Sequence, residues 1–259
     1  MSGAAGNEWR TFASAVQFLT RLPVPDTSDY SLQRLAAAVR YFPLVGALIG
    51  GLCAAVFWLA QLGFPIPVAI VFALATGVAV TGAFHEDGLA DTFDGIGAAA
   101  SDRKRALEIM RDSRLGTYGT IALVAALALK FAALAALPAL GICVALVAGH
   151  GLSRLSSVLA MQTGSYVRED GAGTPVAGPL GGFAWFVVLL TGLLLTAGLA
   201  SLLSPAAALL ALGGAAAGHV AMRLYYEPRL NGYTGDTLGA VQQASEVGLY
   251  LGLSAWIWS

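Results

Sequence analysis

The sequence predicts an all-α integral membrane protein, a polytopic bundle of about seven transmembrane helices with an active site on the cytoplasmic side. Three observations lead to this prediction. Only 11% of the 259 residues are charged and 57% are hydrophobic, whereas soluble domains carry about 25% charged residues. Apolar runs long enough to cross a bilayer recur along the chain. The basic residues collect in alternate connections between these runs.

Seven segments are each long and apolar enough to cross a bilayer, which takes about 20 residues. They cover 41–62, 65–84, 117–137, 138–163, 180–202, 205–225 and 237–258. Pro65, Pro138 and Pro205 each mark the start of a span that follows its predecessor after a very short connection. We therefore expect tight helical hairpins within a single membrane domain, 1–259.

The basic residues predict how these spans are oriented. Twelve of the fourteen Lys and Arg residues lie before the first span, in the second and fourth connections, or at the sixth connection, where Arg223 is in the last turn of its span. Only Lys130 and Arg154 lie deep inside spans. Because basic loops stay on the cytoplasmic side, we expect the N-terminus there. Residues 1–40 are then a cytoplasmic or interfacial segment, in which the apolar stretch 12–22 is too short to span. Residues 85–116 become a cytoplasmic loop and helix.

Composition also limits the partners of the chain. The net charge of −1 gives no reason to expect a nucleic acid, and the apolar surface makes the lipid bilayer the expected partner. Cys53 and Cys143 each lie inside an apolar run, where a small packing role is expected rather than a disulfide. The oligomeric state is left open, with a homo-oligomer as one alternative.

The most polar stretch follows the second predicted span and carries Glu86, Asp87, Asp91 and Asp94. If the helix of that span continues, the three aspartates are spaced i, i+4, i+7 and share one stripe. Aligned carboxylates repel each other, so a bound Mg²⁺ or Mn²⁺ is expected to compensate them. Mg²⁺ is usually held by one or two carboxylates plus substrate phosphates, and the surplus carboxylates suggest a second ion or a base. The alternative is a solvated polar loop that caps a helix.

A basic stretch comes next and is predicted to form a short cytoplasmic helix, with Ser101 as its N-cap. Arg111 and Arg114 lie one turn apart and flank Asp112. Guanidinium groups bind phosphate with two parallel hydrogen bonds, so these two arginines are candidates for phosphate binding. The preceding cluster, 103–105, is explained as well by the positive-inside pattern and anionic lipid headgroups.

A third polar cluster, 231–240, opens the last predicted span. Thr234 or Asp236 there could simply cap the helix, although a functional role is favoured for Asp236. Glu246 lies deeper in the span, beside two glutamines, and an ionisable residue inside a membrane span is a functional candidate by default. Two alternatives stay open for it: a structural partner of a buried cation, Lys130 or Arg154, or a member of the site.

Two further polar side chains lie inside spans. Arg154 shares a helix face with His150 and is expected either to snorkel to the cytoplasmic edge or to reach substrate phosphates. His219 stands alone on the sixth span and is expected to be a packed, hydrogen-bonded histidine.

Five blocks of the sequence, in the same order, resemble the cobalamin synthase family, the adenosylcobinamide-GDP ribazoletransferases. The blocks are 18–23, 41–46, 85–91 with 94–95, 110–116 and 235–240. A lone Asp-x-x-Asp-Gly pattern also occurs in CDP-alcohol phosphotransferases, but their continuation Asp-Gly-x-x-Ala-Arg is missing, since Ile96-Gly97-Ala98-Ala99 follows Asp94-Gly95. This departure argues against a phospholipid synthase.

The resemblance implies a Mg²⁺-dependent transferase of the bacterial inner (cytoplasmic) membrane. In that family α-ribazole, or its 5′-phosphate, displaces GMP from adenosylcobinamide-GDP and gives adenosylcobalamin or its phosphate. Mg²⁺ on Asp87, Asp91 and Asp94 would bridge the diphosphate. Glu86 or Asp112 would accept the proton of the attacking ribose hydroxyl.

The expected site therefore has two sets of residues. The catalytic and metal-binding set is Glu86, Asp87, Asp91, Asp94 and Asp112. The substrate-binding set is His85, Arg111, Ser113, Arg114, Arg154, Thr234, Asp236 and Arg21. Two rival functions are a phosphotransferase acting on CDP-alcohols or a prenyl diphosphate, and a transporter with polar residues along its path. No inverted repeat supports transport.

Overall fold

The computed structural model describes residues 2–24, 31–99, 102–112, 114–168 and 178–258. Within these ranges every regular element is a helix, apart from an isolated bridge between Tyr166 and Tyr233. The helices are α1 (Ser2–Leu19), α2 (Leu32–Ala38), the short 3₁₀ helix η1 (Val39–Tyr41), α3 (Phe42–Ala60), α4 (Ile66–Thr81), α5 (Phe84–Ala99), α6 (Arg103–Ile109), α7 (Thr117–Ala135), α8 (Ala139–Thr163), α9 (Gly182–Leu202), α10 (Pro205–Leu230) and α11 (Gly235–Trp258). The predicted all-α class is confirmed.

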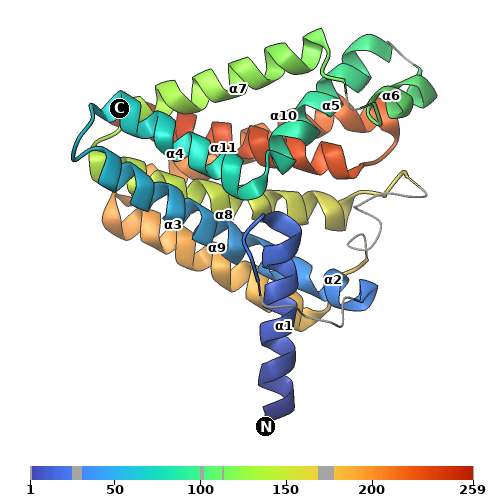
Figure 1. Ribbon diagram of the computed structural model, residues 1–259, viewed down its shortest axis with the longest axis horizontal. Helices are drawn as coiled ribbons and strands as arrows, with labels where there is room; N and C mark the ends of the chain where they lie inside the picture. Colours follow the sequence, from blue (N-terminus) through green and yellow to red (C-terminus); the bar gives the residue numbers. More distant parts are fainter. Residues whose placement is uncertain (1, 25–30, 100–101, 113, 169–177, 259) are drawn as a thin grey trace.

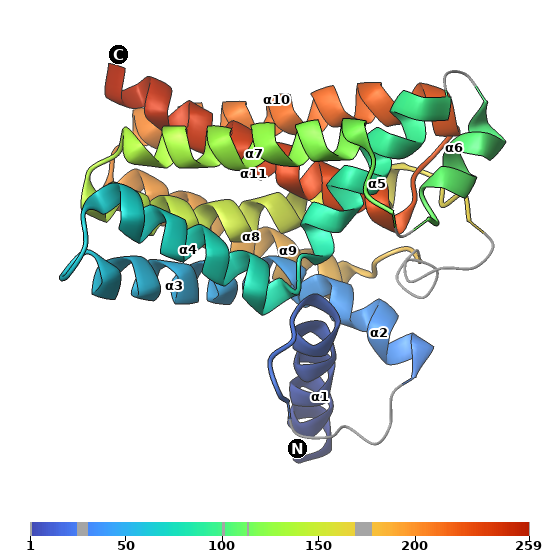
Figure 2. The same ribbon diagram turned by 45° about the horizontal axis from the view of Figure 1, so that its top comes forward.

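The long helices run side by side in two layers, with α3, α4, α8 and α9 in one and α7, α10 and α11 in the other (Figures 1 and 2). Helix α11 is central, because it packs against α5, α7, α8 and α10. Helix α1 projects away from the bundle, and the C-terminus lies at the end opposite α5 and α6 (Figure 1). The site described below lies at the α5 end.

The number of membrane spans differs from the prediction of about seven. Among the described residues, five helical segments are long and apolar enough to cross a membrane, or six if the bent pair α4 and α5 counts as one. Helix α11, expected to span over 237–258, is not among the five although it has 24 residues. Gln242, Gln243 and Glu246 lower its hydropathy, and all three are buried inside the protein. The polytopic helical architecture itself is confirmed.

A sharp corner separates α4 from α5, where the second predicted span was expected to continue as one helix. Gly82 and Ala83 both adopt left-handed backbone angles, with φ of 65° and 62°. Ala83 adopts a left-handed conformation, which is unfavourable for an L-residue by roughly 1–2 kcal/mol. The corner turns α5 by 86° from α4. Helix α5 therefore does not continue in the direction of α4.

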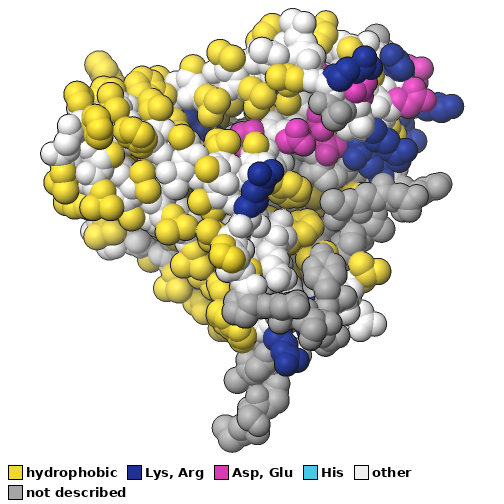
Figure 3. Space-filling model, in the orientation of Figure 1, with side chains coloured by type: hydrophobic (Ala, Val, Ile, Leu, Met, Phe, Trp, Pro, Cys, Tyr) yellow, Lys and Arg dark blue, Asp and Glu magenta, His cyan; other side chains and the backbone are white. Residues whose placement is uncertain are grey.

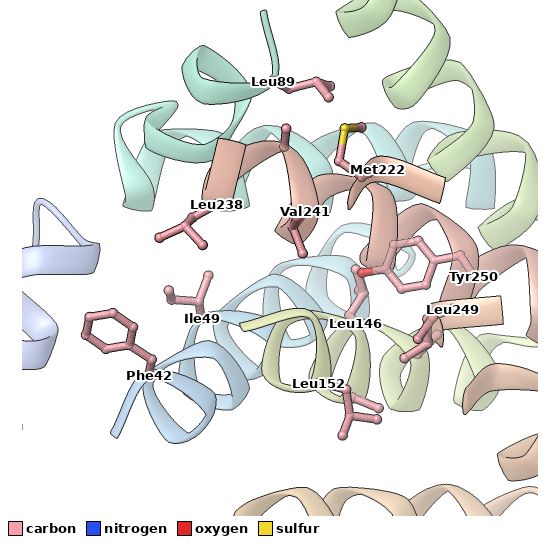
Figure 4. Packing of buried hydrophobic residues seen from close by; sticks show 14 of the residues in the cluster. Phe42, Ile49, Leu89, Leu146, Leu152, Met222, Leu238, Val241, Leu249 and Tyr250 are labelled. Carbon is pink, nitrogen blue, oxygen red and sulfur yellow. The ribbon is translucent and has the colours of Figure 1, made fainter. Parts of the chain in front are cut away.

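Apolar side chains from several helices fill the interior of the bundle (Figure 4). Ile49 of α3, Leu146 of α8 and Leu249 of α11 are each at most 1% exposed. Many other large apolar side chains are exposed on the outer helix faces, for example Leu193 and Leu194 of α9. On the face shown in Figure 3, hydrophobic side chains dominate the end opposite α5 and α6, whereas most of the charged side chains gather at the end with α5 and α6. This distribution is typical of a protein embedded in lipid.

Candidate functional site

A pocket of about 110 Å³ opens among the N-terminal ends of α3, α5 and α11, the C-terminal end of α1 and the cytoplasmically predicted half of α8. Its charged lining residues are Asp87 of α5, Arg154 of α8, Asp236 of α11 and Arg168, which follows α8. Pockets that enclose a drug-sized ligand are typically about 300–1,000 Å³. This one therefore has room for one end of a large substrate.

Backbone contact between α5 and α11 brings the acidic side chains of the two helices together. A Cβ atom on Gly88 would lie only 2.7 Å from the carbonyl oxygen of Asp236, and one on Gly239 would lie 3.1 Å from that of His85. Glycine at both positions lets the two helices touch. Asp87 and Asp91 of α5 are consequently close enough to Asp236 to interact electrostatically.

The carboxylates around Asp91 change its pKa. Burial, together with the neighbouring carboxylates of Asp87 and Asp236, raises the pKa of Asp91 to about 7, while Arg168 acts in the opposite direction. A carboxyl group with such a pKa is half protonated at neutral pH unless a cation lies beside it. Asp94 raises this pKa as well, so the repulsion expected among the three aspartates of α5 is present at Asp91, and Asp236 adds to it.

Arg168 is a site residue that the sequence analysis missed. Its Nη2 lies 2.7 Å from Asp236 Oδ2, its side chain is only 11% exposed, and its buried Nε has no hydrogen-bond partner. The bridge between Tyr166 and Tyr233 holds it there, with Val167 N donating to Tyr233 O and Tyr233 N donating to Ser165 O. Sequence alone showed only a basic residue in a cytoplasmic connection, because its partner lies 68 residues away.

Asp94 has a specific structural partner. One of its oxygens accepts from Gly116 N at 2.7 Å and the other from Gly119 N at 2.9 Å, so the carboxylate caps the N-terminus of α7. A carboxylate is stabilised there by free backbone N–H groups and by the helix dipole. Asp94 thus joins α5 to α7, and its role as a metal ligand stays a prediction.

Glu86 points into a buried polar network rather than into the pocket. Its Oε1 accepts from Gln243, which also donates to Gln242, and Gln242 donates to Glu246. The second oxygen of Glu86, Oε2, is buried without a partner. Glu246 pairs with Lys130 at 3.0 Å, so of the alternatives left open for Glu246, pairing with the buried cation Lys130 is confirmed.

Arg154 lies at the inner end of the pocket. It is 2% exposed, its Nη1 donates to the backbone oxygen of His150 at 2.9 Å, and its buried Nε has no partner. A buried guanidinium N–H group without an acceptor is costly. Arg154 is part of the pocket lining, and its binding to substrate phosphates, the second of the two sequence-based alternatives, stays a prediction.

The basic stretch before α7 lies apart from the pocket lining. Asp112 and Arg114 form an ion pair with each other, and the Arg114 side chain is 87% exposed. The Arg114 guanidinium lowers the pKa of Asp112. Asp102 caps α6 through Arg105 N, in place of Ser101, which lies outside the described residues, as does Ser113. Arg111 is exposed.

The remaining predicted residues have clear positions. His85 is 5% exposed and lines the pocket. Thr234 caps α11, because its Oγ1 accepts from Thr237 N. Arg21 packs its guanidinium over Gly82 at the α4–α5 corner and is not among the pocket-lining residues. His219 is hydrogen-bonded to Ser156 at 2.7 Å, which confirms the expectation of a packed histidine.

The candidate carboxylate ligands can be compared with the coordination shell that Mg²⁺ prefers. Among the described residues, no three or more His, Cys, Asp or Glu side chains are arranged to hold a metal ion by themselves. Mg²⁺, however, usually binds one or two carboxylates and completes its shell with water and substrate phosphates. Asp87 and Asp91 fit such a partial site, because they lie one helical turn apart and neighbouring carboxylates raise the pKa of Asp91.

Comparison with known proteins agrees with these features. Residues 11–254 match the protein family described as cobalamin-5-phosphate synthase. A curated protein of Shewanella amazonensis, named adenosylcobinamide-GDP ribazoletransferase, is 44% identical and covers 97% of both chains. Proteins with the same name from Leptothrix cholodnii and Ralstonia pickettii are 41% and 40% identical, over 97% and 98% of both chains. No solved structure matches the chain.

Proposed function

The chain belongs to the cobalamin-5-phosphate synthase family, and we propose that it catalyses the reaction for which its relatives are named. It transfers the adenosylcobinamide phosphate group from adenosylcobinamide-GDP to α-ribazole or α-ribazole 5′-phosphate. The products are adenosylcobalamin, or its 5′-phosphate, and GMP. The observation that carries this proposal is that Asp87 and Asp236 line one pocket together with Arg154 and Arg168, with Asp91 close enough to both carboxylates to interact electrostatically.

The two arginines bind the diphosphate of the donor. Arg154 and Arg168 each have a buried Nε without a partner, and guanidinium groups are well suited to phosphate oxygens. Both line the same pocket. A phosphate held there is oriented toward the carboxylates of α5 and α11.

Asp87 and Asp91 hold Mg²⁺ in this proposal. When bound, Mg²⁺ neutralises charge on the diphosphate and on the departing GMP. Because Asp87 and Asp91 would supply only part of the coordination shell of Mg²⁺, substrate phosphates and water would complete it.

Asp236 accepts the proton of the attacking ribose hydroxyl. Asp87 and Asp236 are the acidic residues of the pocket lining, and Asp87 is assigned to the metal. The two carboxylates that the sequence analysis considered for this step fit less well. Glu86 accepts from Gln243 in the buried network, and Asp112 pairs with an exposed arginine.

The protein would work in the inner membrane with its pocket on the cytoplasmic side. Lys and Arg side chains gather at the end of the molecule that carries α5 and α6 (Figure 3), and basic residues favour the cytoplasmic face. The two water-soluble substrates would then reach the pocket from the cytoplasm.

The test is an assay of the purified protein in lipid nanodiscs with adenosylcobinamide-GDP and α-ribazole. We expect adenosylcobalamin and GMP in equal amounts, only when Mg²⁺ is present, and none from Asp91→Asn. Glu108→Gln is the matched control, because Glu108 is an exposed carboxylate paired with Arg105. Turnover of CDP-alcohols without GMP release, or corrinoid flux into liposomes without GMP, would overturn the proposal in favour of a rival function.

A further inference from the structure

The pocket has an aromatic wall that phosphate chemistry does not use. The rings of Phe18 and Phe42 are stacked, with centroids 5.5 Å apart and planes 8° from parallel. Phe84 meets Phe18 edge-on, at 5.6 Å and 78°. All three line the pocket that also holds Arg154 and Asp236. The pocket lining thus combines an aromatic cluster with charged side chains.

The position of this wall distinguishes it from the lipid-facing surface. Phe84 is 39% exposed, yet it directly precedes His85 at the start of α5 and lines the same pocket as Asp87 and Arg168. The rings come from α1, α3 and α5, three helices that all contribute to the lining of this pocket. Exposed aromatic rings beside convergent polar groups are typical of a ligand site.

We propose that this wall binds the apolar bicyclic base of the acceptor nucleoside, an inference that rests on the proposed function. Three bases take part in that reaction: the guanine and the adenosyl adenine of the donor, and the dimethylbenzimidazole of α-ribazole. Guanine and adenine both carry hydrogen-bonding groups along their edges, and burying these groups without partners is unfavourable. The three phenylalanine rings offer no such partners. Dimethylbenzimidazole is planar and almost wholly apolar, so it suits the wall.

This assignment also determines where the ribose of the acceptor lies. With its base against the aromatic wall, the ribose extends toward the charged side, where Asp236 lies. A base-sized group is also what the pocket of about 110 Å³ can take, since a corrin ring is far larger. The guanine and the corrin then lie outside this pocket.

The first test uses the wild-type protein and measures equilibrium binding of α-ribosides without donor or Mg²⁺. We expect the ribosides of dimethylbenzimidazole and benzimidazole to bind, and the ribosides of adenine and guanine to bind at least about tenfold more weakly. Equal or tighter binding of the purine ribosides would overturn the inference.

The second test compares Phe84→Leu with Phe93→Leu. Phe93 lies on the same helix, but its ring stacks on Tyr225 away from the pocket, so it is the matched control. Loss of one base-stacking contact predicts a rise of about tenfold in KM for α-ribazole, with kcat and KM for adenosylcobinamide-GDP within about twofold of wild type. Phe18→Leu provides a second variant if Phe84→Leu unfolds.

The outcomes separate this inference from the proposed function. A rise in KM for adenosylcobinamide-GDP alone would place a purine base of the donor at the wall, and unchanged values for both substrates would mean that no base binds there. Either result overturns the inference while GMP release by the wild type still stands. Absence of GMP release by the wild type would instead overturn the proposed function.

Discussion

Arg168 Nη2 lies 2.7 Å from Asp236 Oδ2, and this ion pair joins the segment after α8 to the first turn of α11. The pair is mostly buried, with side chains 11% and 21% exposed. The charge of Arg168 also acts on Asp91, whose pKa it lowers while burial and the other carboxylates raise it. Arg168 therefore balances part of the acidic charge before any phosphate or cation arrives.

Replacing Arg168 should weaken donor binding more than it destabilises the fold. We expect Arg168→Gln to lower kcat/KM for adenosylcobinamide-GDP by about 100-fold, since a charge-assisted hydrogen bond to an ion contributes about 1.5–3 kcal/mol. Arg168→Lys should recover only part of this, because lysine lacks the planar fork. Steady-state kinetics in nanodiscs measures both, with Arg105→Gln as the exposed control. Wild-type kinetics in Arg168→Gln would contradict this role.

Mg²⁺ binding should weaken as the pH falls below neutrality. The pKa of Asp91 is about 7 in the metal-free protein, so its carboxyl group is protonated below that value and Mg²⁺ must displace the proton. We expect the Kd for Mg²⁺ to rise about tenfold per pH unit well below pH 7 and to be constant above about pH 8. Isothermal titration calorimetry between pH 5.5 and 8.5 measures the slope.

Asp91→Asn serves as the control for that pH dependence. The amide does not titrate, so this variant should bind Mg²⁺ more weakly at pH 8 and with a much shallower pH slope. A wild-type Kd that stays constant from pH 5.5 to 8.5 would show that Asp91 does not compete with protons for the metal.

The buried pair of Lys130 and Glu246 leads to a prediction about stability. Both side chains are at most 4% exposed, and their charged atoms lie 3.0 Å apart. Lys130→Met leaves Glu246 as an uncompensated buried charge, which should destabilise the protein by about 3–5 kcal/mol. The double variant Lys130→Met/Glu246→Gln should recover much of this loss, because neither charge remains. Thermal unfolding in detergent compares the variants, with exposed Lys104→Met as the control.

The double variant also tests the polar network. Glu246 accepts from Gln242 and from Tyr250, and Gln242 and Gln243 connect it to Glu86. If the double variant were less stable than Lys130→Met, the hydrogen bonds of Glu246 with Gln242 and Tyr250 would outweigh its pairing with Lys130.

The helical class and the acidic stretch could be predicted from the sequence because both depend on local patterns. Apolar runs identify most membrane helices, and the spacing of Asp87 and Asp91 places them on one stripe. Asp94 shares that stripe in the sequence, but its partners, Gly116 and Gly119, belong to the next helix. No periodicity within α5 indicates such a contact.

The features that could not be predicted arise from tertiary contacts. The 86° corner depends on a left-handed alanine, which residue preferences do not favour. Arg168 became a site residue through a bridge between Tyr166 and Tyr233. The polar α11 was expected to cross the membrane as an apolar span, yet its glutamines and Glu246 are buried against protein. Neighbouring helices shield them from lipid, a condition that a hydropathy pattern does not contain.

The contact between α5 and α11 gives a prediction about the geometry of the site. A Cβ atom on Gly88 would lie 2.7 Å from the carbonyl oxygen of Asp236, closer than two such atoms can approach. Gly88→Ala should therefore push α5 from α11 and separate Asp87 and Asp91 from Asp236. We expect kcat to fall by at least about 100-fold, because small displacements of catalytic groups have effects of this size.

The matched control for this change is Gly213→Ala on α10, where an added Cβ atom has nothing within 4 Å. Alanine favours a helix over glycine by up to about 1 kcal/mol, so this variant should be at least as stable as wild type and fully active. Circular dichroism checks that Gly88→Ala keeps its helices. Full activity of a folded Gly88→Ala protein would mean that the close approach of the two helices does not position the carboxylates for the reaction.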